Sequence, residues 1–211
     1  MKTRWMIVPL GLALLFAAKG LTAADAKSDE KKFEATCPVS GKPAIESSFV
    51  ELKDGAKVYF CCEKCPKAYE AEPKKFKTQV YRQLLETEQI VQVACPITGK
   101  PVNKEEKASV GHADVAFCCE KCLAKFDKAA DDEAKLKLVF SPAAFKKGFT
   151  AQTKCPVSGK PIDPAQSVEY KGQKVYFCCP NCPAPFEKDP EKFAAKLPQL
   201  KKADKAEKEK E

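Results

Sequence analysis

Histidine is nearly absent from this chain of 211 residues, in which His112 is the only one. Because histidine is the side chain most often used for general acid–base catalysis, a histidine-based catalytic cluster is excluded. The sequence also contains no glycine-rich phosphate-binding loop. His112 stands at the hairpin-turn position that Gly55 and Gly172 occupy elsewhere in the chain, so we interpret it as a turn residue rather than a metal ligand.

Long apolar runs are also lacking, except for one near the start of the chain, between residues 5 and 18. It follows the basic Lys2 and Arg4 and precedes small residues at 22–24, a pattern typical of a secretory signal peptide cleaved after Ala24. The run is shorter than the roughly 20 residues of a spanning helix, which favours cleavage over a membrane anchor. The sequence therefore predicts a secreted or periplasmic protein without membrane association after cleavage.

A strong charge of one sign is missing as well. Without residues 1–24 the chain has 34 basic and 29 acidic residues, a net charge of about +5, with lysines spread along it beside acids. This pattern is typical of a solvated surface, and we expect no nucleic-acid partner. Residues 25–35 and 201–211 are charged and poor in apolar residues, which predicts a disordered linker and a disordered tail.

Cysteine, in contrast, is abundant, and all 12 cysteines belong to one pattern that occurs three times. A Cys-Pro-x-Ser/Thr-Gly-Lys-Pro turn begins at Cys37, Cys95 and Cys155, and a Phe-Cys-Cys-x-x-Cys cluster follows each turn. The turns start 58 and 60 residues apart, and units this short usually need a staple such as a metal or disulfides. We divide the chain into repeats at 36–92, 93–152 and 153–200.

Each repeat carries the same order of predicted elements: the turn, a β-hairpin, and a helix that begins at or just after the double cysteine. Asp54-Gly55 between apolar runs is a strong hairpin signal. Apolar spacing predicts further helices between the repeats. The expected strands are 49–52 and 57–60, 108–110 and 115–117, and 167–170 and 174–177; the expected linking helices cover 73–85, 124–139 and 191–197.

The cysteine pattern favours thiolate chemistry. The opening turn resembles a zinc knuckle, in which a glycine with positive φ folds backbone N–H groups toward sulfur. Ser40, Thr98 and Ser158 replace the second knuckle cysteine, so each turn offers a single thiolate beside a hydroxyl. The downstream cluster lies at a helix N-terminus, where partial positive charge also favours thiolate.

Two other uses of these cysteines are open. A disulfide framework suits an exported protein, although adjacent cysteines are awkward to bridge. A reversible mixture, with disulfides in the metal-free protein, remains an alternative. Cys62-x-x-Cys65 has the spacing of a thiol oxidoreductase, but the βαβ context of a thioredoxin-like fold is absent.

The spacing of Cys37, Cys61 and Cys65 resembles that of the TRASH domain, and the junctions around Cys61 and Cys178 resemble that of the related YHS domain. In both junctions a Tyr-Phe-Cys strand end is followed by an aromatic residue and then by an acidic residue, proline and Lys-Phe further along. The resemblance implies an α+β chain of three tandem treble-clef-like zinc-binding modules joined by helices. Such modules are associated with heavy-metal trafficking, resistance and sensing.

The resemblance also implies the ligands. Cys62, Cys119 and Cys179 are additional to the family pattern, and each either supplies a fourth ligand or replaces the first of its pair. Thiolates suit Zn²⁺ or Cu⁺, and the lack of methionine outside residues 1–24 favours zinc. The implied ligands are Cys37, Cys61 and Cys65; Cys95, Cys118 and Cys122; and Cys155, Cys178 and Cys182.

The sequence thus predicts an exported protein, not an enzyme, that holds or relays zinc or copper ions through cysteine thiolates. One alternative is a set of structural zinc modules that serves as a scaffold for a protein partner. A thiol–disulfide redox protein is the less favoured alternative.

Overall fold

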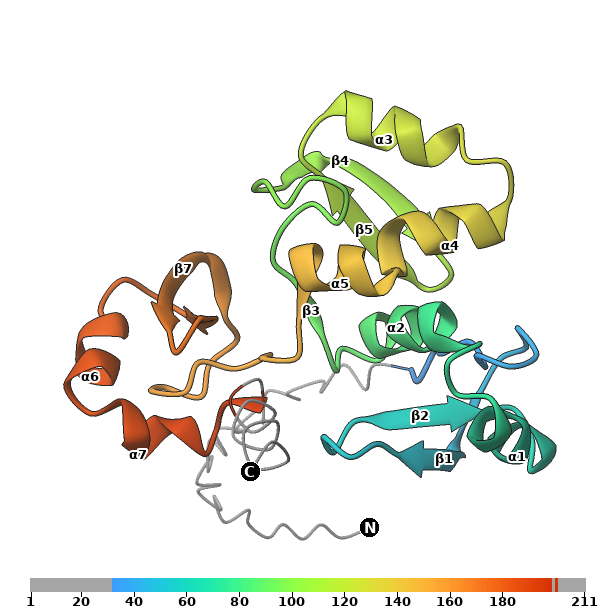
Figure 1. Ribbon diagram of the computed structural model, residues 1–211, viewed down its shortest axis with the longest axis horizontal. Coiled ribbons are helices and arrows are strands. Elements are labelled where there is room, and N and C mark those ends of the chain that lie inside the picture. Colours follow the sequence, from blue (N-terminus) through green and yellow to red (C-terminus); the bar gives the residue numbers. More distant parts are fainter. Residues whose placement is uncertain (1–31, 199, 201–211) are drawn as a thin grey trace, which may run out of the picture. The chain divides into compact units, whose positions relative to one another are not determined.

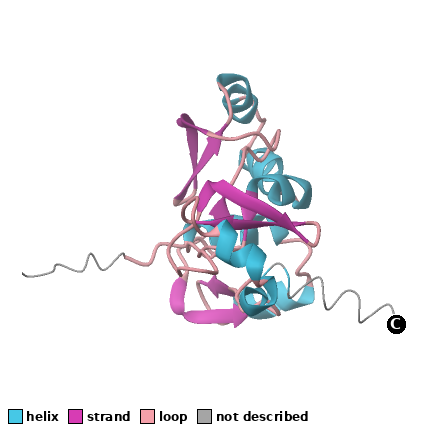
Figure 2. Cartoon of the chain, turned by 90° about the vertical axis from the view of Figure 1, so that its left-hand side faces the viewer, coloured by secondary structure: helices cyan, strands magenta, loops and turns pink. Residues whose placement is uncertain are grey.

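The computed structural model describes residues 32–198 and residue 200. The predicted signal peptide at 1–24 and the tail at 201–211 lie outside the described residues, as does the predicted linker except for residues 32–35. Each repeat contains a two-stranded hairpin followed by a helix, so the predicted mixture of α and β structure is confirmed (Figure 1). The strands do not merge into one sheet but form separate antiparallel pairs (Figure 2).

The hairpins agree with the sequence prediction except that their first strands begin about four residues earlier and β5 begins two residues earlier, at Ala113. In each hairpin the pairing register shifts within the first strand, for example between Ile45 and Phe49. The residues before the shift are mostly polar and exposed, so no apolar alternation marked them as strand. The strands are β1 (Ile45–Glu51), β2 (Lys57–Phe60), β4 (Asn103–Val110), β5 (Ala113–Phe117), β7 (Asp163–Tyr170) and β8 (Gln173–Phe177).

Three linking helices differ from the prediction. The helix expected from residue 73 starts only at Lys77, because residues 73–76 form turns and Phe76, at φ −97° and ψ 11°, is the N-cap. The run expected at 124–139 is two helices, separated where the Asp131 side chain accepts the N–H of Ala134 and caps the second one. The last helix ends at Ala194 rather than at residue 197.

The observed helices follow the hairpins of the three repeats in order (Figure 1). They are α1 (Lys64–Ala71), α2 (Lys77–Glu86), α3 (Glu120–Asp127), α4 (Asp132–Phe140), α5 (Pro142–Gly148), α6 (Pro183–Lys188) and α7 (Pro190–Ala194). A fourth short antiparallel pair joins the two linkers between repeats, β3 (Val91–Gln92) with β6 (Phe149–Thr150).

Repeats 1 and 2 share one hydrophobic core, whereas repeat 3 has its own. The shared core contains 18 buried residues, including Phe60, Phe117, Val139 and Phe140. The core of repeat 3 contains seven, among them Phe177. Repeat 3 therefore has much less buried apolar surface to stabilise it than repeats 1 and 2 together.

A buried carboxylate connects repeats 1 and 2. Glu86 at the end of α2 accepts hydrogen bonds from the backbone N–H and hydroxyl of Thr36, at 2.7 and 3.0 Å, and from the N–H of His112, at 3.2 Å. Arg82 lies 3.3 Å from the same carboxylate. Gly111 has φ +68°, which glycine adopts at least cost, and a Cβ there would overlap the Glu86 carboxylate, so that side chain would have to shift.

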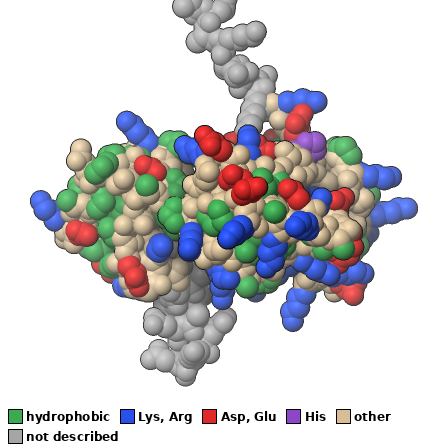
Figure 3. Space-filling model, turned by 90° about the horizontal axis from the view of Figure 1, so that it is seen from above, with side chains coloured by type: hydrophobic (Ala, Val, Ile, Leu, Met, Phe, Trp, Pro, Cys, Tyr) green, Lys and Arg blue, Asp and Glu red, His purple; other side chains and the backbone are tan. Residues whose placement is uncertain are grey.

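The surface is mixed in charge. On the face shown in Figure 3, Lys and Arg side chains are interspersed with Asp and Glu. Within the part of the chain that the structure describes, no helix combines the length and apolar character needed to cross a membrane.

Candidate metal centre

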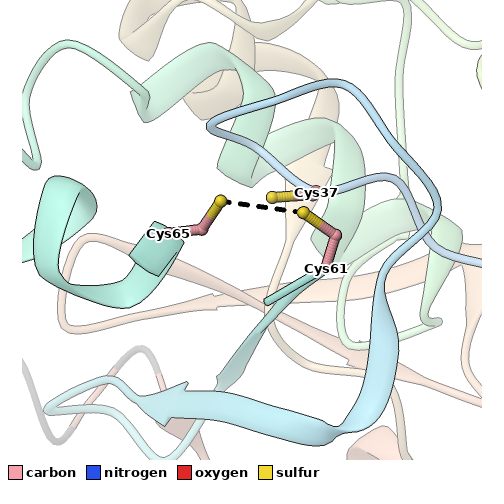
Figure 4. A group of neighbouring side chains, drawn as sticks. All are labelled: Cys37, Cys61 and Cys65. Atoms are coloured by element: carbon pink, nitrogen blue, oxygen red, sulfur yellow. Dashed lines mark hydrogen bonds between the residues drawn. The ribbon is translucent and has the colours of Figure 1, made fainter. Parts of the chain in front are cut away.

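Three groups of three cysteines are the prominent chemical feature of the structure. Within each group the sulfur atoms all lie within 4.8 Å of one another. The two downstream sulfurs are 3.7 Å apart in every repeat. Figure 4 shows the first group, with the side chains of Cys37, Cys61 and Cys65 pointing toward one another. The other groups are Cys95, Cys118 and Cys122, and Cys155, Cys178 and Cys182.

The first cysteine of each group is held by a tight turn. The N–H of Cys37 donates to the carbonyl oxygen of Lys42 at 2.8 Å, and the N–H of Gly41 donates back to the carbonyl oxygen of Cys37 at 3.0 Å. Gly41 has φ +72°, which few other residues adopt at low cost. The same two hydrogen bonds and a positive-φ glycine recur at Cys95 and Cys155. The predicted knuckle-like turn is thus present three times.

The other two cysteines are held by the junction between strand and helix. Cys61 directly follows Phe60, whose buried ring anchors the end of β2, and Cys65 lies in the first turn of α1 (Figure 4). Tyr69, one helical turn beyond Cys65, packs on Phe60 with a ring-centroid distance of 5.7 Å. The equivalent pairs are Phe117 with Phe126 and Phe177 with Phe186.

The hydroxyl that replaces the second knuckle cysteine contacts the site. Ser40 Oγ lies 3.1 Å from Cys61 Sγ, Thr98 Oγ1 lies 3.2 Å from Cys118 Sγ, and Ser158 Oγ lies 3.1 Å from Cys178 Sγ. In each repeat the hydroxyl also accepts the backbone N–H two residues further on, at 3.3 Å. This hydroxyl therefore tethers the turn to a sulfur on the opposite side of the site.

The knuckle-like turn favours a thiolate. Burial acts to raise the pKa of Cys37, but hydrogen bonds from the Ser40 hydroxyl and from backbone N–H groups outweigh it and lower the pKa to about 7. The same causes lower the pKa of Cys95 to about 7 and that of Cys155 to about 6. Each site thus holds one sulfur that is ready to bind a metal near neutral pH.

The helix cysteine has the opposite tendency. Burial and contacts with the neighbouring sulfurs raise the pKa of Cys65 to about 12, and the pKa values of Cys122 and Cys182 likewise to about 12. Three sulfurs this close cannot all be thiolates unless a cation neutralises them. A bound metal ion would supply that positive charge.

The three additional cysteines lie beside the groups and not within them. Cys62 Sγ is 3.5 Å from Cys65 Sγ, and Cys179 Sγ is 3.5 Å from Cys182 Sγ, whereas Cys119 Sγ is 3.7 Å from Cys118 Sγ. Cys62 and Cys119 are exposed, and Cys179 is half-buried. The structure thus brings nine of the 12 predicted site residues into compact groups. Whether the other three also bind metal stays a prediction.

The donor set fits a thiophilic metal. Two thiolates bound to one Zn²⁺ at about 2.3 Å in tetrahedral geometry have sulfurs about 3.8 Å apart. The observed 3.7 Å separation between the two downstream sulfurs agrees with this value. Three soft sulfur donors also suit Cu⁺. All 12 cysteines are free thiols, so no disulfide competes for the sulfurs in this structure.

His112 lies outside all three groups. It occupies the β4–β5 turn, and its Nδ1 is 3.7 Å from a carboxylate oxygen of Glu34. Its place in the turn agrees with the sequence interpretation. The positive φ in this turn belongs to the preceding Gly111.

The sequence analysis did not identify three glutamines, one in each repeat, whose side chains connect the two halves of the cysteine site. Gln83, Gln92 and Gln152 each hydrogen-bond both to the carbonyl just before the first cysteine and to the second hairpin strand. A signal existed for two of them, because Gln92 and Gln152 both stand three residues before the knuckle cysteine. No such signal existed for Gln83, which comes from α2.

These features define a class of small repeats in which a knuckle-like turn and a strand-to-helix junction place three thiols at one point. Residues 153–196 match the YHS domain family, which covers most of repeat 3. The match and the three equivalent cysteine groups are consistent with a TRASH/YHS-type metal-binding domain that recurs along the chain. No curated protein and no solved structure matches the chain.

We expect the affinity of each site for zinc to fall as the pH falls. Binding displaces a proton from Cys65 throughout the neutral range, and from Cys37 as well once the pH drops below its pKa of about 7. In repeats 1 and 2, linkage then predicts a loss of at least about tenfold from pH 8 to 7 and at least about 100-fold per unit below pH 6; in repeat 3 the steeper dependence begins about one unit lower, because the pKa of Cys155 is about 6. Titration against a competing chelator at several pH values measures this, and an affinity independent of pH would contradict thiolate ligation.

Proposed function

We propose that this protein is an exported carrier of soft metal ions that binds one ion on the three thiolates of each repeat and relays it to a recipient. The observation that carries the proposal is the threefold recurrence of the same sulfur triangle with the same supporting contacts. On this proposal each repeat is a treble-clef-like module, zinc is the favoured ion with Cu⁺ as the alternative, and the chain is not an enzyme.

Accessible sulfur supports a relay role. Cys61, Cys118 and Cys178 are half-buried rather than sealed in the core. The additional thiol in each repeat lies within 3.7 Å of a sulfur of the group. An incoming or outgoing ion could bind this outer thiol before the inner ligands exchange. Export rests on residues 1–24, whose sequence has the pattern of a signal peptide.

A structural role is the second candidate, and the small core of repeat 3 favours it. Only seven buried residues form that core, two of them the cysteines Cys155 and Cys182. A domain of this size commonly relies on a metal as a staple. In that case the surfaces of the repeats would bind a protein partner, and the metal would stay in place as long as the fold does.

Metal exchange separates the two candidates. If the protein is a carrier, zinc in the loaded chain should exchange with excess isotopically labelled zinc much faster than the protein unfolds, because only ligands need to open. Native mass spectrometry follows the exchange, and hydrogen exchange of the buried hairpin amides gives the opening rate of the fold.

The outer thiols provide a matched control. Replacing Cys62, Cys119 and Cys179 together by serine should slow zinc exchange without removing metal, because an entering or leaving ion then has no outer thiol to bind. Exchange no faster than global unfolding in the wild-type chain would contradict the carrier proposal and support the structural candidate.

A further inference from the structure

One glutamine bridges the two halves of the cysteine site in every repeat, and it is buried in repeats 1 and 3 and half-buried in repeat 2. In repeat 3 the side chain of Gln152 is 1% exposed, and its Nε2 donates to the carbonyl oxygens of Lys154, at 3.1 Å, and Tyr176, at 2.5 Å. Its Oε1 accepts the N–H of Tyr176 at 3.0 Å. Lys154 directly precedes the knuckle cysteine, and Tyr176 is two residues before the strand-end cysteine.

The same hydrogen bonds recur in the other repeats. In repeat 2, Gln92 Nε2 donates to the carbonyl oxygens of Ala94, at 3.1 Å, and Ala116, at 2.6 Å, and Gln92 Oε1 accepts the N–H of Ala116 at 2.9 Å. The partners occupy the same positions relative to the cysteines as in repeat 3. The backbone hydrogen bonds within the hairpin would not by themselves require the glutamine to contact the residue before the knuckle cysteine.

Repeat 1 reaches the same arrangement from a different part of the chain. There the position three residues before the knuckle cysteine is Glu34, and Gln83 of α2 takes the bridging role. Gln83, which is 0% exposed, donates to the carbonyl oxygens of Thr36, at 2.9 Å, and Tyr59, at 2.7 Å, and accepts the N–H of Tyr59 at 2.8 Å. A second source for the same three hydrogen bonds indicates that the bridge, rather than its sequence position, is what the site requires.

The glutamine amide acts as a one-residue extra strand. It exchanges both an N–H and a C=O hydrogen bond with one residue on the outer edge of the second hairpin strand, as a neighbouring strand would. Its remaining N–H fixes the residue before the knuckle cysteine. Three backbone groups are thereby satisfied, and the turn is held to the strand end that carries the second ligand.

We propose that Gln83, Gln92 and Gln152 are positioning residues that preorganise the three-sulfur sites for metal binding. The inference rests on the proposed function, because it assumes that the sulfur triangles bind metal. A metal ion is held tightly when its ligands are fixed before it arrives, and outer-shell hydrogen bonds commonly contribute 10- to 100-fold to affinity. The glutamine touches no sulfur and acts only through the backbone segments that carry the cysteines.

The test is a cobalt(II) titration of the full chain carrying Gln152→Met, which keeps the side-chain volume but removes every hydrogen bond of the amide. The two unaltered repeats serve as internal references. We expect two equivalents to bind as in the wild-type chain and the third to bind about 10- to 100-fold more weakly. The sulfur-to-cobalt charge-transfer band of that third equivalent should also change, which a loss of stability alone would not cause.

Two further variants sharpen the result. Gln92→Met should weaken one equivalent in the same way, in repeat 2. Gln166→Met, in the half-buried middle of β7 in repeat 3, should leave all three equivalents unchanged. Amide NMR spectra of the metal-free variants show whether the altered hairpin stays folded.

The outcomes separate the inference from the proposed function. If both glutamine variants bind three equivalents of cobalt(II) with equal affinity and an unchanged charge-transfer band, the inference is overturned while metal binding stays intact. Loss of the affected hairpin's amide signals in both variants would overturn it in favour of a purely structural role. A wild-type chain that takes up no cobalt would instead overturn the proposed function.

Discussion

Serine in place of Cys155 should reduce the metal content of the chain from three equivalents to two. Cys155 supplies the sulfur whose pKa, at about 6, is the lowest of the knuckle cysteines, and it is 2% exposed. A serine hydroxyl is not deprotonated near neutral pH and is a poor donor for soft metals. Elemental analysis after gel filtration measures the loss.

The neighbouring Cys179 offers the matched control. Its sulfur lies 3.5 Å from Cys182 Sγ but outside the three-sulfur group, so Cys179→Ser should retain three equivalents. If Cys179→Ser loses an equivalent as Cys155→Ser does, the additional cysteine is a fourth ligand and the site is a closed four-thiolate centre. If neither variant loses metal, cysteine ligation in repeat 3 is contradicted.

Removing metal with a chelator should unfold repeat 3 before repeats 1 and 2. A metal ion whose free concentration is about 1,000 times its Kd adds about 4 kcal/mol to the free energy of unfolding. This is a large part of the roughly 5–15 kcal/mol that is typical of a whole domain. Repeat 3 has seven buried core residues to compensate for this loss, whereas repeats 1 and 2 share 18. Repeats 1 and 2 are also joined by the buried Glu86 carboxylate.

Hydrogen exchange read by mass spectrometry measures this order. Peptides from β8 and α6 should lose protection at a chelator concentration at which peptides from β2 and β5 remain protected. Adding zinc back should restore the protection of β8. Simultaneous loss in all three repeats would contradict the division into a shared core and a separate one, and no loss anywhere would show that the metal does not stabilise the fold.

Local signals allowed the sequence to predict the hairpins, the strand-to-helix junctions and the grouping of the cysteines. A hairpin turn such as Asp54-Gly55, an aromatic residue before the double cysteine and a repeated spacing are each encoded within a few residues. The start of α2 at Lys77 had no such local signal, because Pro73 is itself a residue that can open a helix and the apolar spacing already includes Phe76.

The contacts that support the site were harder to predict because they are non-local. Gln83 bridges residues 24 and 47 positions away, and Glu86 reaches Thr36 and the turn at His112. No spacing in the sequence of repeat 1 marks these side chains. The sequence also could not show that Cys62, Cys119 and Cys179 lie beside the three-sulfur groups, because the placement of adjacent cysteines depends on the path of the backbone through the strand-to-helix junction.

The most direct test of metal binding is elemental analysis, combined with a free-thiol count, of the protein purified from its native compartment. The proposed function predicts close to three equivalents of one thiophilic metal, with zinc favoured, and 12 free thiols after the metal is removed under denaturing conditions. Protein that contains no metal and no free thiols would contradict it and would show that the cysteines form a disulfide framework instead.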